Sequence, residues 1–83
     1  MGGTVTVGTH FTAYEVKDGQ VTGFRERQIA EPFTAPCTSP QDYAAPTLSN
    51  PQGHIRLVQI LGGPYEGIWV NPDERGVSFT PSG

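Results

Sequence analysis

The pair Asp18-Gly19 constrains the fold of this chain more than any other feature of its sequence. It separates two runs of strand-forming residues, HFTAYEVK over 10–17 and QVTGF over 20–24. A two-residue Asp-Gly connection between such runs is a strong hairpin signal, because both turn residues must adopt positive φ. The sequence therefore predicts a β-hairpin here, and Gly23 in the returning strand predicts a bulge or a close backbone approach.

Further short runs of strand formers are spread along the rest of the chain. They cover residues 4–7, 54–61, 65–71 and 76–80. The run Asn71-Pro72-Asp73-Glu74 predicts a turn, and residues 25–31 fit either an extended strand or one helical turn. The sequence therefore predicts an all-β fold, a small single-domain barrel or roll of five to six short strands.

The composition agrees with this fold and limits its size. The 83 residues include 11 Gly and 8 Pro, and hydrophobic residues make up 35% of the chain. These values favour turns over long helices, and a chain this short forms one β-domain over residues 1–83. The length excludes a two-domain enzyme, a dinucleotide-binding fold and a (β/α) barrel.

One segment, residues 32–53, differs from the rest because it is rich in proline. It holds five prolines, with Ser, Thr, Asn and Gln between them. Proline removes a backbone donor and restricts the residue before it, so no regular element is expected here. A connection of this length inside a compact domain is usually functional or disordered, and we therefore expect a long Pro-rich loop.

The charge pattern excludes two classes of partner. The net charge is −3, and the five basic residues form no cluster. Phosphate neutralisation and attraction to an anionic membrane surface both require a basic patch, so neither nucleic acid nor membrane is an expected partner. No apolar run is long enough to cross a bilayer. The low charge and the Thr, Gly, Pro and Ser content favour an extracellular, envelope or virion setting over the cytoplasm.

The residues that carry chemistry do not form a recognisable active site. Cys37 with His10 or His54, and with Asp42, supplies the types of a cysteine nucleophile and its base. The spacing favours a free loop thiol instead, because no helix N-terminus lowers the pKa of Cys37. His10 and His54 lack metal-ligand spacing, and no nucleotide-binding glycine motif is present. We expect no catalytic residue, no metal and no cofactor.

The aromatic residues give the stronger indication of function. Strand alternation predicts an inward-facing set of Tyr14, Val16, Leu57, Ile68, Val70, Val77 and Phe79. The same alternation places Tyr65 and Trp69 on one outer surface, with Tyr43 on the adjoining loop. Exposed aromatic rings offer rigid apolar area to sugars, peptides or partner chains. The competing interpretation is that Trp69 packs beneath the Pro-rich loop and anchors it.

The end of the chain resembles a known family. Gly67-Ile68-Trp69-Val70, a short turn and Gly76-Val77-Ser78-Phe79 are similar to the end of bacterial SH3-like modules of the cell-wall-targeting type. The resemblance covers mainly the C-terminal third. It implies an SH3-like barrel that binds peptidoglycan or its peptide stems, as an appendage of a cell-wall hydrolase such as a phage lysin, with Trp69 as a contact residue.

These observations support two main hypotheses. In the first, the protein is a non-enzymatic module that recognises a cell-wall polymer or a protein surface through Trp69, Tyr65 and Tyr43. In the second, it is a structural phage or virion component that forms a homo-oligomer or other assembly, with residues 4–7 and 77–80 as pairing edge strands. A small enzyme, or an inhibitor that inserts the Pro-rich loop into a partner, is a third alternative.

Overall fold

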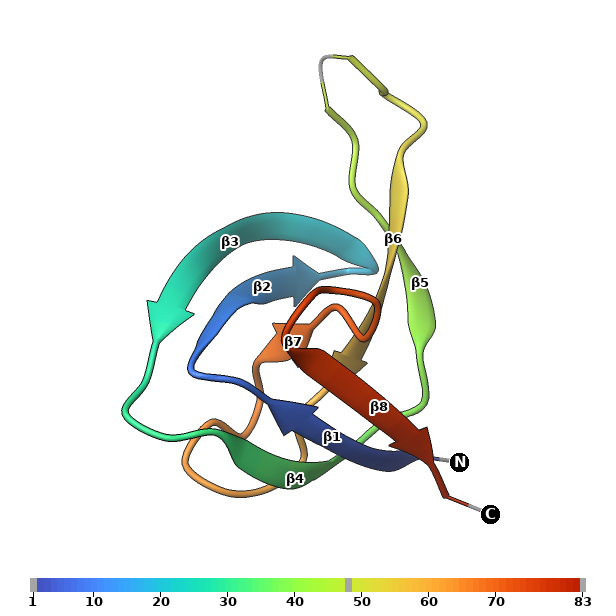
Figure 1. Cartoon of the computed structure of the whole chain (residues 1–83). Helices are drawn as coiled ribbons and strands as arrows, with labels where there is room; N and C mark the ends of the chain where they lie inside the picture. Colours follow the sequence, from blue (N-terminus) through green and yellow to red (C-terminus); the bar gives the residue numbers. More distant parts are fainter. Residues whose placement is uncertain (1, 48, 83) are drawn as a thin grey trace.

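A computed structural model describes residues 2–47 and 49–82 of the chain (Figure 1). This part contains eight β-strands and no helix, so it contains no helix able to cross a membrane. The strands are β1 (Gly3–Val7), β2 (His10–Lys17), β3 (Gln20–Gln28), β4 (Phe33–Cys37), β5 (Gln41–Ala44), β6 (His54–Gln59), β7 (Trp69–Val70) and β8 (Val77–Pro81).

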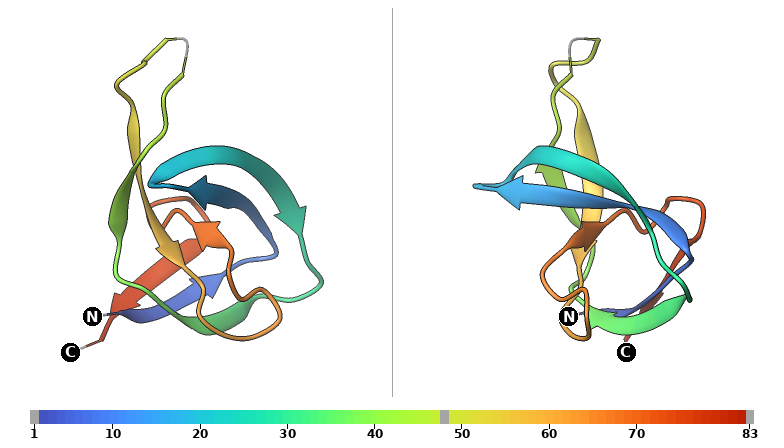
Figure 2. Two further views of the ribbon diagram at one scale, coloured as in Figure 1. Left: turned by 180° about the vertical axis from the view of Figure 1, so that it is seen from behind. Right: turned by 90° about the vertical axis from the view of Figure 1, so that its left-hand side faces the viewer.

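The strands form a three-stranded sheet in the order β4-β1-β8 and a closed barrel in the order β2-β3-β5-β6-β7. The three-stranded sheet lies across one side of the barrel (Figures 1 and 2). Gly2 and Ser82, which flank β1 and β8, lie side by side, because the Ser82 N–H donates to the Gly2 carbonyl at 3.1 Å. The predicted all-β barrel or roll is confirmed. The strand number exceeds the expected five to six because the Pro-rich segment contributes β4 and β5.

The hairpin predicted at Asp18-Gly19 joins β2 to β3. Asp18 has φ 54° and Gly19 has φ 76°, the two positive values that this turn requires. The predicted irregularity near Gly23 is also present, because the register passes from Glu15–Gly23 to Val16–Val21. Thr22 is the extra residue of this bulge. Of the two alternatives for residues 25–31, an extended strand or one helical turn, the structure shows a strand, which continues to Gln28.

The main core lies between the three-stranded sheet and one face of β2, β6 and β7. Alternate residues of each strand point into it, as the period of two requires. Its buried members are Val5, Val7, Phe11, Ala13, Ala35, Cys37, Val58, Ile60, Val70 and Val77. The Phe11 ring lies edge-on to the Phe33 ring at 6.1 Å between centroids. This apolar layer joins the two sheets into one unit.

The expected long loop over residues 32–53 is wrong in its first half, where β4 and β5 form. Pro36 fits within β4 because its carbonyl accepts the N–H of Leu61 at 2.8 Å, so its nitrogen also faces away from β1. The pairing of β4 with β1 therefore loses no donor. The described residues between β5 and β6, 45–47 and 49–53, project beyond the body of the molecule (Figures 1 and 2).

The strand expected over 65–71 is mostly absent, because the segment begins with turns. Gly63 has φ 89° and Gly67 has φ 98°, values that favour glycine. Only Trp69–Val70 pairs as a strand. The turn predicted at residues 71–74 is confirmed: the Asn71 side chain accepts the N–H of Asp73 at 2.8 Å, and the Asn71 carbonyl accepts that of Glu74 at 3.1 Å.

Two further expectations need correction. Residues 4–7 were expected at a sheet edge, but β1 pairs along its whole length with β4 on one side and β8 on the other. The expectation of an edge strand near residues 76–80 is confirmed, since in the described part of the chain β8 pairs with β1 alone. Tyr14 and Val16 do not face the main core, because Phe11 and Ala13 of β2 fill it and residues of the other parity face away.

The other residues that were predicted to face inward are buried or partly buried. Leu57, Val70 and Val77 are buried, and Ile68 and Phe79 are partly buried against the main core. Leu57 is fully buried but does not belong to the main core cluster. Its burial therefore indicates a second apolar environment, on the opposite face of the barrel strands.

Candidate functional site

The strand registers place a row of aromatic residues on the face opposite the main core. Phe24 of β3 is the Cα partner of Tyr14 of β2, Tyr14 is the partner of Trp69 of β7, and Trp69 is the partner of Gln59 of β6. Side chains of directly opposed residues leave a sheet on the same side. Leu57 lies two residues before Gln59 on β6, so its side chain is on the same side. We call the side defined by Phe24, Tyr14, Trp69 and Leu57 the aromatic face.

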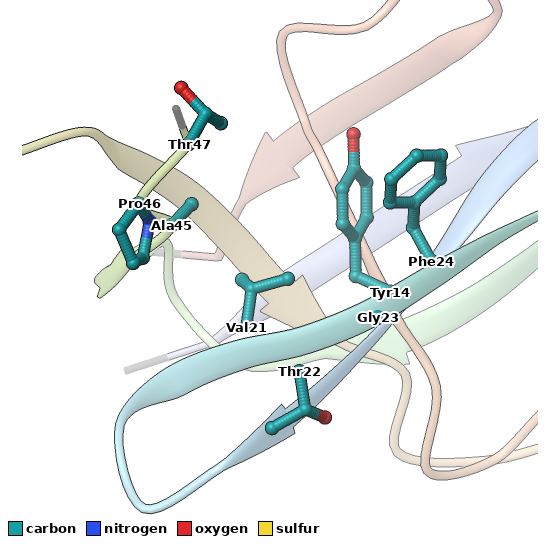
Figure 3. Close-up of a pocket in the computed structure, with 8 residues that line it drawn as sticks. All are labelled: Tyr14, Val21, Thr22, Gly23, Phe24, Ala45, Pro46 and Thr47. Carbon is teal, nitrogen blue, oxygen red and sulfur yellow. The ribbon is translucent and has the colours of Figure 1, made fainter. Parts of the chain in front are cut away.

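An open apolar groove of about 340 Å³ lies at the β3 end of the aromatic face (Figure 3). One wall carries Tyr14 and Phe24, whose rings project side by side with centroids 6.2 Å apart. Val21 projects between this wall and the opposite one, whereas Thr22 points to the other side of the hairpin. The opposite wall is the segment Ala45-Pro46-Thr47, which follows β5.

Phe24 is the most unusual residue of this groove. It is 71% exposed, and Leu61 at 48% is the other large hydrophobic residue that is exposed in the described part of the chain. A single exposed apolar side chain needs no explanation. Phe24, however, adjoins Tyr14 and faces a proline across a hollow, which is an arrangement suited to contact with another molecule.

Tyr14 supplies a phenol hydroxyl to the groove. Burial raises the pKa of its phenol above the ordinary value, and the negative charge of Glu74 raises it further. The hydroxyl therefore stays protonated at neutral pH. It makes no hydrogen bond within the described residues, so it is free to donate to, or accept from, a bound molecule.

The three residues predicted as contacts lie in different environments. Trp69 is partly buried on the aromatic face beside Tyr14. Tyr43 lies on β5 opposite Ile55, two residues before the groove wall, and its hydroxyl donates to Gln41 Oε1 at 3.2 Å. Trp69 and Tyr43 therefore border the groove without lining it.

Tyr65 was expected to share an outer surface with Trp69, and this placement is wrong. The Tyr65 ring stacks on Phe33 at 4.9 Å and lies edge-on to Phe11 at 6.3 Å, so it packs against the main core. The guanidinium of Arg27 lies 5.6 Å from its centroid. The expectation assumed a strand over 65–71, and the turn that forms instead breaks the alternation.

The groove residues Tyr14, Phe24 and Pro46 were missed by the sequence analysis, although a signal for two of them was present. A two-residue turn at Asp18-Gly19 without a bulge pairs Tyr14 with Gly23. The bulge indicated by Gly23 shifts this pairing by one residue, to Phe24. Combining the two signals therefore predicts the cross-strand aromatic pair.

The residues considered for catalysis or metal binding are not assembled into a site. Cys37 is not a loop thiol: it is 1% exposed within β4, and burial raises the pKa of its thiol against a smaller opposing effect of a hydrogen bond with the Gly3 backbone. The His54 imidazole lies 3.1 Å from the Asp42 carboxylate. Over residues 2–47 and 49–82, no three His, Cys, Asp or Glu side chains come together as metal ligands.

A second, smaller hollow of about 210 Å³ lies near the start of β2, beside Glu26 and Arg75. Glu74 accepts the backbone N–H of Thr12 here through Oε2 at 3.0 Å. This carboxylate therefore connects the turn before β8 to the outer edge of β2, which is a structural role.

Comparisons with models of protein families, with curated proteins and with solved structures found no match to this chain. The fold and the site therefore define the protein by themselves. It is a small all-β barrel domain with an open aromatic groove on one face.

Proposed function

We propose that this protein is a non-enzymatic binding module that recognises a polymer chain or a protein surface through the groove lined by Tyr14, Phe24 and Pro46. The observation that carries the proposal is the 71% exposure of Phe24 beside a second aromatic ring. Burying the exposed part of a phenylalanine side chain under a ligand contributes about 1–2 kcal/mol. This gain is available only in a complex.

The size and lining of the groove support binding rather than catalysis. Its volume of about 340 Å³ lies at the lower end of ligand sites, which run from about 300 to 1,000 Å³. An open groove of this size fits one or two side chains or a sugar ring. Among the described residues that line the groove, Tyr14 is the only titratable one, and its raised pKa keeps the phenol neutral. This favours a role in hydrogen bonding over proton transfer.

Two ligand classes fit this chemistry. The SH3-like resemblance of residues 67–79 implies a cell-wall polymer, and aromatic rings stack on the apolar faces of sugars as well as on peptides. A protein surface with a protruding apolar side chain is the other class. Trp69 and Tyr43 border the groove and would contact the outlying parts of a long ligand in either case.

The test compares two alanine variants that each remove one exposed hydrophobic side chain. Phe24→Ala alters the groove, whereas Leu61→Ala is a matched control whose exposed side chain does not line the groove. We expect purified cell walls, or a partner protein, to retain the native protein and Leu61→Ala but to release Phe24→Ala. Equal retention of both variants in every assay would contradict the proposed site.

Assembly with neighbouring subunits is the second candidate, and one observation favours it. Strand β8 pairs only with β1, so its other edge is unpaired among the described residues. Pro81 at the end of β8 offers no N–H to a neighbour and shortens the usable edge. A molecular mass by light scattering that increases with protein concentration, and returns to that of one chain in Ser78→Lys, would favour this candidate.

A further inference from the structure

Strand β3 has a long edge without a partner in the described structure. On one side it pairs with β2 from Gln20 to Gln28, but on the other side it meets β5 only through the pair Gln20–Ala44. The chain of β5 then leaves along the opposite wall of the groove. Residues 24–28 therefore form a free edge that begins at the groove.

The hydrogen-bond pattern shows which peptide groups face outward along this edge. The N–H of Ile29 donates to the carbonyl of Thr9 at 2.8 Å, which makes this pair a hydrogen-bonded one. In an antiparallel ladder such pairs alternate with pairs whose peptide groups face away. Arg25 and Arg27 therefore bond to β2, and the N–H and C=O groups of residues 24, 26 and 28 face outward.

An independent contact supports this assignment. Thr12 is the Cα partner of Glu26, so its peptide group must also face away from the hairpin ladder. Its N–H donates to the Glu74 carboxylate at 3.0 Å, on the far side of β2. Within the described residues, no hydrogen bond occupies the outward groups of Phe24, Glu26 and Gln28.

The side chains along the edge differ between its two faces. Phe24, Glu26 and Gln28 lie on the aromatic face, and Arg25 and Arg27 lie on the opposite face. The ion pairs of the described residues are His54–Asp42 and Arg56–Asp73, so neither arginine of the edge takes part in one. A strand added to this edge would meet an aromatic ring on one face and two positive charges on the other.

These charges disfavour a second copy of the chain as the occupant. Antiparallel pairing of β3 with its own copy about a two-fold axis opposes residues of equal parity. Registers centred on residue 25, 26 or 27 bring Arg25 against Arg25, Glu26 against Glu26, or Arg27 against Arg27. Like charges directly opposite each other destabilise a sheet, so the edge selects a strand of complementary sequence.

We propose that the free edge of β3 binds an extended peptide segment of a partner protein as an added strand, with an apolar side chain against Phe24 and acidic side chains against Arg25 and Arg27. This inference rests on the proposed binding function and specifies its ligand. Outward groups at every second residue repeat at about 7 Å along a strand, a spacing that another polypeptide backbone matches. The apolar side chain nearest Phe24 then enters the groove beneath Pro46.

The test uses a blocked synthetic peptide in which Asp alternates with Val and Phe, and a second peptide with Lys in place of Asp. We expect the Asp peptide to bind more tightly in calorimetric titrations. On binding, the amides of Phe24, Glu26 and Gln28 should become slow in hydrogen exchange, while those of Arg25 and Arg27, already bonded to β2, should change little. Binding without this alternating protection would overturn the added strand.

Charge reversal provides the second arm. Arg25→Glu should weaken the Asp peptide about tenfold and strengthen the Lys peptide, whereas Arg56→Glu, the same change on β6, should leave both affinities unaltered. If both peptides bind the two variants equally, or if the Asp peptide does not bind, the proposal fails.

A last experiment distinguishes failure of the added-strand proposal from failure of the proposed binding function. Peptide-free glycan chains and intact cell walls are offered to the native protein and to Phe24→Ala. Retention that requires Phe24, together with a failed peptide arm, keeps the groove as a binding site but overturns strand addition. Retention of neither ligand, with no peptide binding, overturns both.

Discussion

Two phenylalanines of the same hairpin allow a direct test of the division between core and groove. Phe11 is 2% exposed and packs in the main core, whereas Phe24 is 71% exposed at the groove. Truncation of a buried phenylalanine to alanine costs about 3–5 kcal/mol, because it removes transfer free energy and leaves a cavity. Only about three-tenths of the Phe24 side chain is protected from water, so Phe24→Ala should cost under about 1 kcal/mol.

Urea denaturation followed by the fluorescence of Trp69 measures both changes. With a typical slope of about 1–2 kcal/mol per molar urea for a small domain, Phe11→Ala should shift the midpoint by about 1.5 M or more. Phe24→Ala should shift it by about 1 M or less. The affinity for a groove ligand should fall about tenfold or more in Phe24→Ala, since the exposed part of the ring is what a ligand covers.

Equal destabilisation by the two substitutions would refute this reasoning. It would mean that Phe24 packs against the protein in solution and that the groove is closed in the free molecule. A small stability loss with unchanged ligand affinity would instead leave the fold assignment intact and remove Phe24 from the binding surface.

Three further predictions concern other parts of the molecule. Since burial raises the pKa of Cys37 in the folded state, the free energy of unfolding should fall as pH rises above the pKa of the thiol in the unfolded chain; denaturation at pH 7 and pH 10, compared with Cys37→Ala, checks this. A Cβ at Gly3 would overlap the carbonyl oxygen of Thr80, so Gly3→Ala should lower the melting temperature by several degrees in calorimetry, and an unchanged value would contradict the close β1–β8 approach. Trp69 is partly buried, so its emission maximum should lie between those of buried and water-exposed indole; a fully exposed value would contradict its partial burial beside Tyr14.

The hairpin was predictable because its signals are local. Asp18 and Gly19 specify the turn by their own backbone preferences, and Gly23 marks the bulge a few residues later. The pairing of Tyr14 with Phe24 follows from these two features alone. This part of the candidate site could therefore be derived from the sequence before any long-range contact was known.

The strands of the Pro-rich segment could not be derived in this way. Pro36 lies in β4 because its nitrogen faces away from β1, and this depends on the distant pairing partners of both sides. The sequence shows that a proline lacks a backbone N–H, but it does not show whether a neighbouring strand needs that N–H as a hydrogen-bond donor. Pro46 lines the groove because β5 pairs with the distant strand β6, and the sequence alone does not show this pairing.

The expected surface with Tyr65 and Trp69 failed for a local reason instead. Alternation over 65–71 assumes extended backbone throughout, whereas Gly63 and Gly67 adopt positive φ and turn the chain. Glycine permits this conformation but does not require it. The contact of Tyr65 with Phe33 then depends on which turn forms, and the sequence does not determine that choice.

Within residues 2–47 and 49–82, the barrel closes between β3 and β5 at one residue pair, Gln20–Ala44, where the N–H of Ala44 donates to the carbonyl of Gly19 at 3.2 Å. A seam of this kind contributes only about 1 kcal/mol per hydrogen bond, far less than the apolar layer that holds the remaining strands. The tip of the β2–β3 hairpin should therefore separate from β5 and pair with it again many times for each global unfolding event. When this contact opens, the space between Val21 and Ala45 widens. Access of a ligand to the groove is therefore controlled by the weakest contact of the barrel.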